Sequence, residues 1–154
     1  MKYTTCTTVL QEVPGEVSLA FSISNCPLRC LYCHSTQLRT DIGTPLTVDR
    51  LQAELDACRS PHTGMYTVTC VLFFGGDQHE SELLELLQHC RKQSLRTCLY
   101  TGHTDVSDSL KSQLDYLKVG PYIDYLGALD KPTTNQRFYR LSDNADLTHL
   151  FWSN

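Results

Sequence analysis

The segment TCVLFF, Thr69–Phe74, carries apolar or small side chains at every position, and the two glycines of Gly75–Asp77 end it. A short apolar run bounded by glycine predicts a strand whose two faces are both buried. Strands of this kind are typical of parallel sheets, because helices cover both of their faces. The segment therefore favours an α/β fold with this strand near the centre of the sheet.

The segments on either side alternate between strand and helix patterns. Besides 69–74, strand patterns occupy 7–13, 17–24 and 96–101, and apolar residues recur at helical spacing in 47–59, 80–93 and 106–117. Residues 116–119 fit either the end of the last helix or the start of a further strand, and 124–145 has only weak periodicity. Such alternation indicates right-handed crossovers, mainly parallel strands and a functional site at their carboxyl ends. The segments that follow the strands are therefore expected to gather at one edge.

The composition predicts one soluble domain spanning residues 1–154, since 154 residues with 41% hydrophobic content suffice for a single core. The first twenty residues lack the continuous apolar run of a signal peptide, and no run has the length of a membrane span. The formal net charge is -4, and the charges are interspersed, so no basic stripe is available for a nucleic-acid backbone. We expect a cytoplasmic protein with neither a membrane nor a nucleic acid as partner.

The chain contains eight cysteines, which is a smaller share than in small disulfide scaffolds and favours a reducing compartment. Four of them lie within apolar patterns and are expected to be small buried hydrophobes: Cys58, Cys70, Cys90 and Cys98. Cys6 receives no assignment. The remaining three, Cys26, Cys30 and Cys33, form the motif CxxxCxxC in the stretch CPLRCLYCH, directly after the strand predicted at 17–24.

Three thiolates are one ligand short of a closed zinc site or of a cluster held at all four corners. His34 is a poor fourth ligand, because adjacent residues such as Cys33 and His34 rarely converge on one ion. An iron–sulfur cluster held by three thiolates instead leaves one iron open to another ligand. Thiolates suit both zinc and iron–sulfur clusters, so the spacing alone leaves both open.

The cysteine motif, with Tyr32 before its last cysteine, resembles the signature of radical S-adenosylmethionine (SAM) enzymes. The resemblance implies that Cys26, Cys30 and Cys33 hold a [4Fe-4S] cluster whose fourth iron binds the amino and carboxylate groups of SAM. It also implies that an electron from the cluster splits SAM into methionine and a 5′-deoxyadenosyl radical, with the cofactor carrying the chemistry. The fold that this family implies is a partial (β/α) barrel of mainly parallel strands, open on one side.

Two further motifs follow predicted strands and agree with this resemblance. FFGGD, Phe73–Asp77, stands where the family has a GGE-like motif that contacts the SAM amino group, and CLYTGH, Cys98–His103, is similar to the family's third strand. The resemblance thus implies that SAM is bound by Tyr32, Gly75, Gly76, Asp77, Tyr100 and Thr101. His79 and His103 also follow strand ends, and we expect them to be structural or solvent-facing.

The stretch LDYLKVGPYIDYLGALDKPTTNQRFYRL, Leu114–Leu141, resembles anaerobic ribonucleoside-triphosphate reductase activating proteins, including the element KPTTNQR at Lys131–Arg137. This resemblance implies an activase that abstracts a glycine Cα hydrogen from the large subunit of anaerobic ribonucleotide reductase and so installs a glycyl radical. Flavodoxin or ferredoxin is the implied reductant, and no side chain acts as a catalytic acid or base. The alternatives are an activase of another glycyl-radical enzyme such as pyruvate formate-lyase, an enzyme similar to 7-carboxy-7-deazaguanine synthase, and a non-catalytic zinc-binding interaction module.

Overall fold

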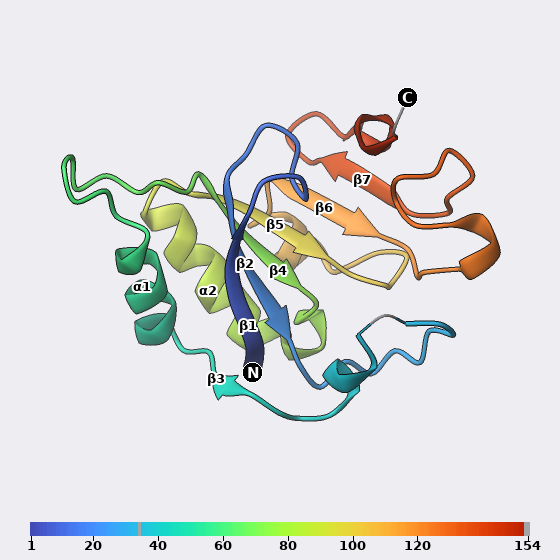
Figure 1. The fold of residues 1–154 in the computed structure, drawn as a ribbon, viewed down its shortest axis with the longest axis horizontal. Helices are drawn as coiled ribbons and strands as arrows, with labels where there is room; N and C mark the ends of the chain where they lie inside the picture. The colour runs from blue at the N-terminus through green and yellow to red at the C-terminus, as the bar shows by residue number, and fades with distance from the viewer. Residues whose placement is uncertain (34, 153–154) are drawn as a thin grey trace.

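The computed structural model describes residues 1–33 and 35–152. Its eight strands form one sheet in the order β3-β1-β2-β4-β5-β6-β7-β8 (Figure 1). The strands are β1 (Lys2–Val9), β2 (Ser18–Ile23), β3 (Thr44–Pro45), β4 (Cys70–Phe74), β5 (Arg96–Tyr100), β6 (Tyr116–Val119), β7 (Arg137–Arg140) and β8 (Ala145–Asp146). The helices are α1 (Val48–Ala57), α2 (Glu80–Lys92) and α3 (Asp108–Lys111), with the 3-10 turns η1 (Thr36–Arg39), η2 (Asp77–His79), η3 (Asp124–Leu126) and η4 (Thr148–Phe151). None of these described helices has the length and apolar character needed to cross a membrane.

The centre of the sheet is parallel, as the apolar run at 69–74 predicts. That run forms β4, which pairs in parallel with β2 on one side and β5 on the other, and β5 pairs in parallel with β6. Helix α2 connects β4 to β5, and α3 lies between β5 and β6. The carboxyl ends of these strands therefore meet at one edge of the sheet, where ligands of α/β folds bind.

The sheet as a whole is mixed, and the prediction of a partial (β/α) barrel of mainly parallel strands is wrong. Among the described strands, four of the seven pairings are antiparallel: β1 with β2, β1 with β3, β6 with β7 and β7 with β8. A parallel pair needs a crossover of a dozen or more residues, usually a helix, whereas a shorter connection returns antiparallel. The described chain has no α-helix between β1 and β2, which residues 10–17 connect, or between β6 and β7, and both of these pairs are antiparallel.

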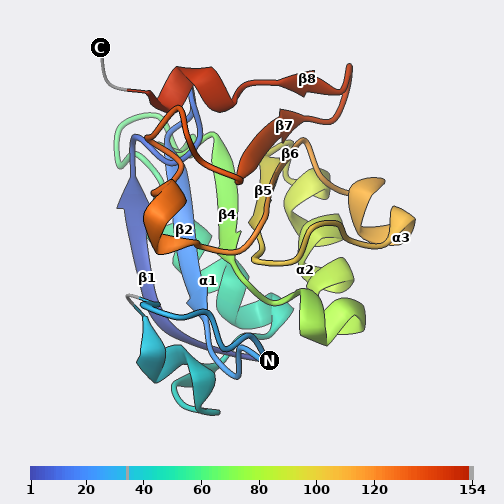
Figure 2. The ribbon, with the colours of Figure 1, turned by 90° about the vertical axis from the view of Figure 1, so that its right-hand side faces the viewer.

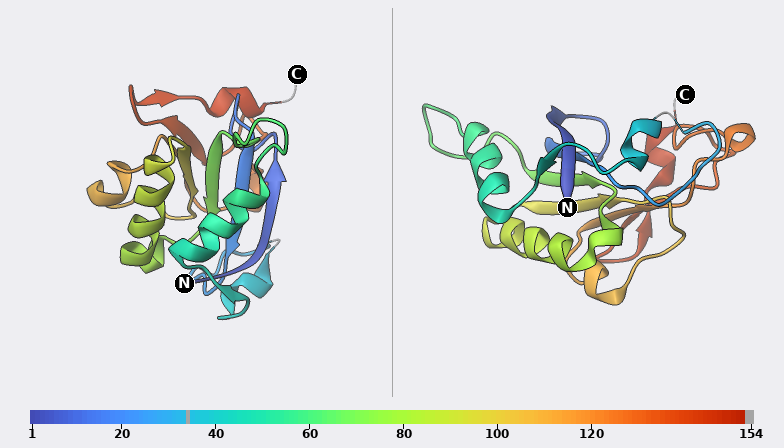
Figure 3. Two further views of the ribbon diagram at one scale, coloured as in Figure 1. Left: turned by 90° about the vertical axis from the view of Figure 1, so that its left-hand side faces the viewer. Right: turned by 90° about the horizontal axis from the view of Figure 1, so that it is seen from below.

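The helices cover one face of the sheet, and loops cover the other (Figures 2 and 3). Alternate residues of a strand point to opposite faces, so neighbouring positions contribute to two separate clusters. The cluster under the helices includes Phe21, Phe73, Leu83, Leu87 and Leu117. The cluster on the other face includes Val13, Leu72, Cys98, Tyr116 and Phe138. The second face is therefore closed by the segment before β2 and by the C-terminal part of the chain, without a helix layer.

The helices begin where the sequence predicts, but one of them ends early. Thr47 Oγ1 accepts a hydrogen bond from Arg50 N at 3.2 Å and so caps α1, within the predicted 47–59, and α2 lies within the predicted 80–93. The helix predicted at 106–117 is only the single turn α3, because Asp115 Oδ2 accepts a hydrogen bond from Thr97 N at 2.9 Å and thereby ties the chain to β5. Residues 116–119 consequently form the strand β6, the alternative that the sequence left open.

Both ends of the chain differ from the prediction. The first strand, β1, covers Lys2–Val9 and not 7–13, and the weakly periodic 124–145 contains β7 and part of β8.

The burial of the cysteines predicted to be small buried hydrophobes follows the prediction more closely. Cys70, Cys90 and Cys98 are fully buried, whereas Cys58 at the end of α1 is only partly buried.

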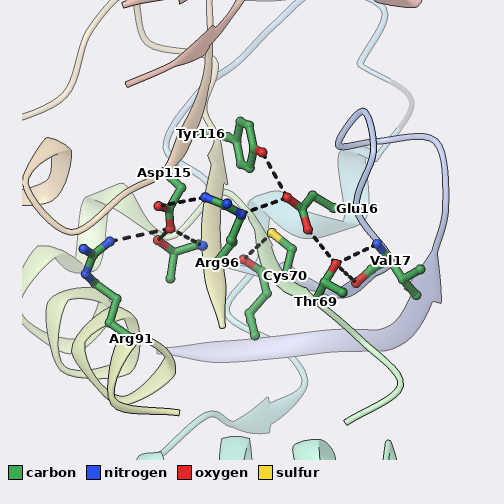
Figure 4. A network of polar contacts seen from close by, with 10 residues as sticks. Glu16, Val17, Thr69, Cys70, Arg91, Arg96, Asp115 and Tyr116 are labelled. Carbon is green, nitrogen blue, oxygen red and sulfur yellow. Dashed lines mark hydrogen bonds and ion pairs between the residues drawn. The ribbon is translucent and has the colours of Figure 1, made fainter. Parts of the chain in front are cut away.

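A polar network joins the amino ends of the parallel strands, at the end of the sheet opposite the carboxyl edge (Figure 4). Glu16 Oε2 accepts a hydrogen bond from Thr69 Oγ1 at 2.6 Å, and Glu16 Oε1 accepts one from the Tyr116 hydroxyl at 2.9 Å. Arg96 bridges two acids, with Nε 3.1 Å from Glu16 Oε1 and Nη1 3.7 Å from Asp115 Oδ1. One glutamate thus connects the starts of β2, β4, β5 and β6.

Candidate functional site

The cysteines of the CxxxCxxC motif lie in the segment that leaves the carboxyl end of β2, described over residues 25–33 and 35–42 (Figure 2). Hydrogen bonds within this cysteine loop fix its path. Cys26 N donates to Leu38 O at 2.8 Å, and Arg39 Nη2 donates to Cys30 O at 2.7 Å. The η1 turn therefore folds back over the motif and holds the backbone of two of its cysteines.

All three motif cysteines are free and partly buried, and they line one cavity of about 760 Å³. Burial is the main cause that raises the pKa of the Cys26 thiol, and the nearby Cys30, Cys33 and Asp77 raise it further. Cys33 Sγ accepts a hydrogen bond from Ser35 N at 3.4 Å. The three thiols thus share a single environment at the carboxyl edge of the sheet. His34, predicted not to be a ligand, lies outside the described residues.

The wall of this cavity includes residues from each segment that was expected to gather at the edge. Besides the thiols, it contains Gly75, Asp77, Tyr100, Thr101 and Lys118. Strand register places Phe74 of β4 beside Tyr100 of β5, and Tyr100 beside Lys118 of β6. The structure therefore brings the cysteine loop together with the GGD and Tyr-Thr-Gly segments, in the order of the parallel strands.

The GGD segment is held against the cysteine loop by Gln78. Its Nε2 donates to Ser24 O at 3.2 Å and to Asn25 O at 3.1 Å, and its Oε1 accepts from Gly76 N at 3.2 Å. Gly75 and Gly76 have φ values of +80° and +109°, a region that side chains rarely adopt. The turn after β4 therefore requires both glycines, and it brings the backbone close to the cysteine loop.

Asp77 is engaged by two neighbours from the segment after β5. Its Oδ2 accepts a hydrogen bond from Thr101 Oγ1 at 2.8 Å and lies 2.6 Å from His103 Nδ1. The Asp77 side chain is 10% exposed, and its Oδ1 accepts no hydrogen bond from the described residues. Sequence reasoning treated His103 as structural or solvent-facing and did not foresee this contact, which spans 26 positions of the chain. One carboxylate oxygen is thus fixed, and the other remains available to a ligand.

Lys118 is a charged residue of the cavity wall that sequence reasoning missed. It is 8% exposed, and its Nζ donates to Gly120 O at 2.8 Å. Burial lowers the pKa of Lys118 to about 8. The sequence did contain a sign of this role, because Lys118 stands within the otherwise apolar run YLKV. A lysine is almost never fully buried unless it is paired, so a lysine in a buried strand points to a polar site.

Two of the predicted SAM contacts do not face the cavity. Tyr32 is 66% exposed and has a φ of +63°, and Gly76 lies in the turn but outside the cavity wall. Of the PTTNQR element, Gln136 does reach the wall, where its Nε2 donates to Gly120 O at 3.4 Å. Asn135 Nδ2 donates to Pro121 O at 2.9 Å, so it orders the loop and does not line the cavity.

Residues 13–145 match a family model described as a 4Fe-4S single cluster domain, and this range contains all three motif cysteines. The chain belongs to this family. No match was found among curated proteins. The family supports an iron–sulfur cluster of the [4Fe-4S] type as the cofactor of this chain.

The donor set of the cavity fits such a cluster. A cluster binds each thiolate at a different iron, so its ligands need not converge on a single point. A cavity of about 760 Å³ lies within the range of small-molecule and cofactor sites. The three motif cysteines and the size of the cavity are therefore compatible with a [4Fe-4S] cluster.

Proposed function

We propose that this chain is a radical SAM activase that installs the glycyl radical of anaerobic ribonucleotide reductase. The observation that carries the proposal is the shared cavity, which is lined by the three free cysteines of the motif together with Asp77 and the ends of β4, β5 and β6. The family supports the cluster, and the motif resemblances around the cavity support SAM as its second component. When bound, the cluster and SAM would supply a 5′-deoxyadenosyl radical that takes one hydrogen from a glycine Cα.

The protein's own side chains would have two roles, to hold the cluster and to orient SAM. The thiolates of Cys26, Cys30 and Cys33 would each hold one iron, and the remaining iron would accept the amino and carboxylate groups of SAM. The Oδ1 of Asp77 would accept a hydrogen bond from an N–H of the SAM amino group, because Thr101 and His103 already fix Oδ2. A carboxylate held in this way is preorganised, so it loses little freedom when the ligand binds.

Apolar side chains form part of the wall of this cavity. Leu28 and Leu38 of the cysteine loop, Phe74 of β4 and Leu129 of the C-terminal region all line it. Water exclusion protects reactive species from side reactions and strengthens electrostatic contacts within a site. We infer that this wall shields the radical step while one side stays accessible to a protein substrate.

The exposed tip of the cysteine loop is the proposed region of protein contact. Leu31 is 74% exposed and Tyr32 is 66% exposed, and both lie between the ligands Cys30 and Cys33. Exposed apolar side chains next to a reactive centre are typical of interaction sites. We propose that the glycine loop of the reductase large subunit, and flavodoxin or ferredoxin as reductant, approach the cavity from this side.

Anaerobic reconstitution with iron and sulfide tests the cluster, and dithionite with SAM tests the chemistry. Wild-type protein is expected to hold about four iron and four sulfide per chain and to release 5′-deoxyadenosine. Cys30→Ser should lose both, whereas Cys58→Ser, a control outside the cavity wall, should keep both. Failure to produce 5′-deoxyadenosine from protein with an intact cluster would refute the SAM proposal, and zinc without sulfide would favour a zinc-binding module.

A glycyl radical on the large subunit, detected by electron paramagnetic resonance after incubation with the activase, SAM and reductant, tests the partner. The expected result is a signal that requires all three components and is absent with Cys30→Ser. Release of 5′-deoxyadenosine without a radical on this subunit would point to another glycyl-radical enzyme or to a small-molecule substrate.

A further inference from the structure

Gln136 is a buried residue of the cavity wall whose side-chain amide is largely unpaired. It is 6% exposed, and its side chain makes one hydrogen bond within the described chain, a long one of 3.4 Å from Nε2 to Gly120 O. Lys118 Nζ already donates to the same oxygen at 2.8 Å. A primary amide has two N–H donors and an oxygen with two lone pairs, so one donor and the oxygen of Gln136 are left for another group.

Gln78, the other side-chain amide among the described wall residues, shows the contrast. Its Nε2 donates to Ser24 O at 3.2 Å and to Asn25 O at 3.1 Å, and its Oε1 accepts from Gly76 N at 3.2 Å. Buried polar groups are hydrogen-bonded as a rule, and an exception needs an explanation. Gln78 therefore serves the fold, whereas Gln136 keeps binding capacity that the fold does not use.

The KPTTNQR element holds the backbone of Gln136 in place. Gln136 N donates to Thr134 Oγ1 at 3.1 Å, and Gln136 O accepts a hydrogen bond from Arg137 Nη1 at 2.7 Å. The segment also packs directly on Gly120, where an added Cβ would lie 3.2 Å from Gln136 Cα. A residue whose backbone is already ordered loses less freedom when a ligand binds. The element therefore fixes the point from which this amide extends.

The unpaired groups of Gln136 match those of a peptide main chain. Each residue of a main chain offers one N–H donor and one C=O acceptor, and a side-chain amide can pair with both kinds of group. A glycine has no side chain, so an enzyme that selects a glycine can form hydrogen bonds to that residue only through its main chain. Ala128 and Leu129 of the same C-terminal part of the chain also line the cavity, and their side chains offer no hydrogen bond.

We propose that Gln136 binds the main chain of the substrate polypeptide at the glycine that loses its hydrogen. Its Oε1 accepts the N–H of that glycine, and the unpaired hydrogen of its Nε2 donates to a neighbouring carbonyl of the same polypeptide. This inference rests on the proposed function, because it requires a glycine residue as the substrate. It gives the KPTTNQR element a direct role in recognising the substrate, besides its role in ordering the loop.

Gln136→Met removes the amide and keeps the length of the side chain, and Gln88→Met is the matched control on an exposed amide of α2. Binding is measured on reconstituted protein with SAM but without reductant, so that no turnover occurs. The probe is a peptide that spans the target glycine of the reductase large subunit. We expect Gln136→Met to bind this peptide about tenfold to a hundredfold more weakly than wild type, because two hydrogen bonds are lost. Its iron and sulfide content and its affinity for SAM should equal those of wild type, and Gln88→Met should match wild type throughout.

A second peptide carries N-methylglycine at the target position and therefore lacks the N–H that Gln136 is proposed to bind. Wild type should bind it about tenfold more weakly than the first peptide, because the buried Oε1 is then left unpaired. Gln136→Met has no such acceptor, so its two affinities should differ much less. Coupling between the two changes isolates this one contact, since a general loss of structure would weaken the binding of both peptides alike.

The inference is overturned if Gln136→Met keeps the wild-type affinity for the glycine peptide, or if it discriminates between the two peptides as wild type does. It is also overturned if Gln136→Met binds SAM more weakly, since the amide would then contact the adenine, whose edge carries a donor and acceptors as well. These results leave the proposed function intact. If instead the wild-type protein takes up no cluster or releases no 5′-deoxyadenosine, the proposed function itself fails.

Discussion

Replacing Glu16 with alanine should destabilise the fold without changing the composition of the cofactor site. Glu16 is the junction of the network at the amino ends of the parallel strands, and its side chain is only 11% exposed. The cavity lies at the opposite, carboxyl ends of the same strands. Loss of this carboxylate therefore removes contacts between strand starts and none within the cavity.

The magnitude follows from three contacts. Hydroxyl groups of Thr69 and Tyr116 donate to the carboxylate at 2.6 and 2.9 Å. A hydrogen bond to a charged group contributes about 1.5 to 3 kcal/mol, so two at the lower end come to about 3 kcal/mol. Arg96 is half exposed, and its ion pair adds at most about 1 kcal/mol. We expect Glu16→Ala to lower the free energy of unfolding by about 3 kcal/mol and Tm by about 6 to 12 °C.

Urea unfolding of the iron-free protein under reducing conditions, followed by circular dichroism, measures this change. Glu85→Ala is the matched control, because Glu85 is exposed on α2 and should change stability by less than about 0.5 kcal/mol. Iron and sulfide per folded chain should equal the wild-type values in both variants. A loss below about 1 kcal/mol for Glu16→Ala, or an equal loss for Glu85→Ala, would refute this account of the network.

Three further outcomes are expected. Tyr116→Phe, which removes one donor to Glu16, should cost about 1.5 kcal/mol in the same urea assay, and a cost equal to that of Glu16→Ala would contradict the shared network. In Gly102→Ala the new Cβ would lie 2.4 Å from Leu28 Cδ1, so we expect the cysteine loop to shift and reconstitution to give less iron per chain; wild-type iron content would argue against that coupling. Burial raises the pKa of the Cys70 and Cys90 thiols to about 12, so at pH 8 iodoacetamide should leave both unmodified in the folded protein; alkylation of either, detected by mass spectrometry of digests, would show that the strand and helix open.

The elements that the sequence predicts correctly are those that depend on the pattern of apolar residues within one short segment. The apolar run of β4 and the helical spacing of α1 and α2 each depend on neighbouring residues alone, and all three elements are where they were expected. The antiparallel flanks depend on how the chain connects distant strands. The described connection between β6 and β7 contains the short turn η3 and no α-helix, β7 pairs antiparallel with β6, and the weak periodicity of 124–145 gave no sign of this.

In the candidate site, too, residues that are close in sequence were predicted and contacts between distant segments were not. The three motif cysteines are close in sequence, and their gathering around one cavity follows from the loop that carries them. The contact of Asp77 with His103 joins two separate loops, and Lys118 reaches the cavity only because β6 is in register with β5. Contacts of this kind depend on strand order, which motif spacing alone does not encode.

The two-residue outer strands β3 and β8 cover only part of the strands beside them. Each leaves few unpaired backbone N–H and C=O groups, and Pro45 in β3 has no N–H to offer. Long, flat edge strands act as templates on which further strands add, and short or proline-containing edges prevent this. Beyond the two residues that β3 covers, Thr4–Val9 of β1 have no partner strand on their outer side among the described residues, so this stretch is the backbone edge available to an added strand.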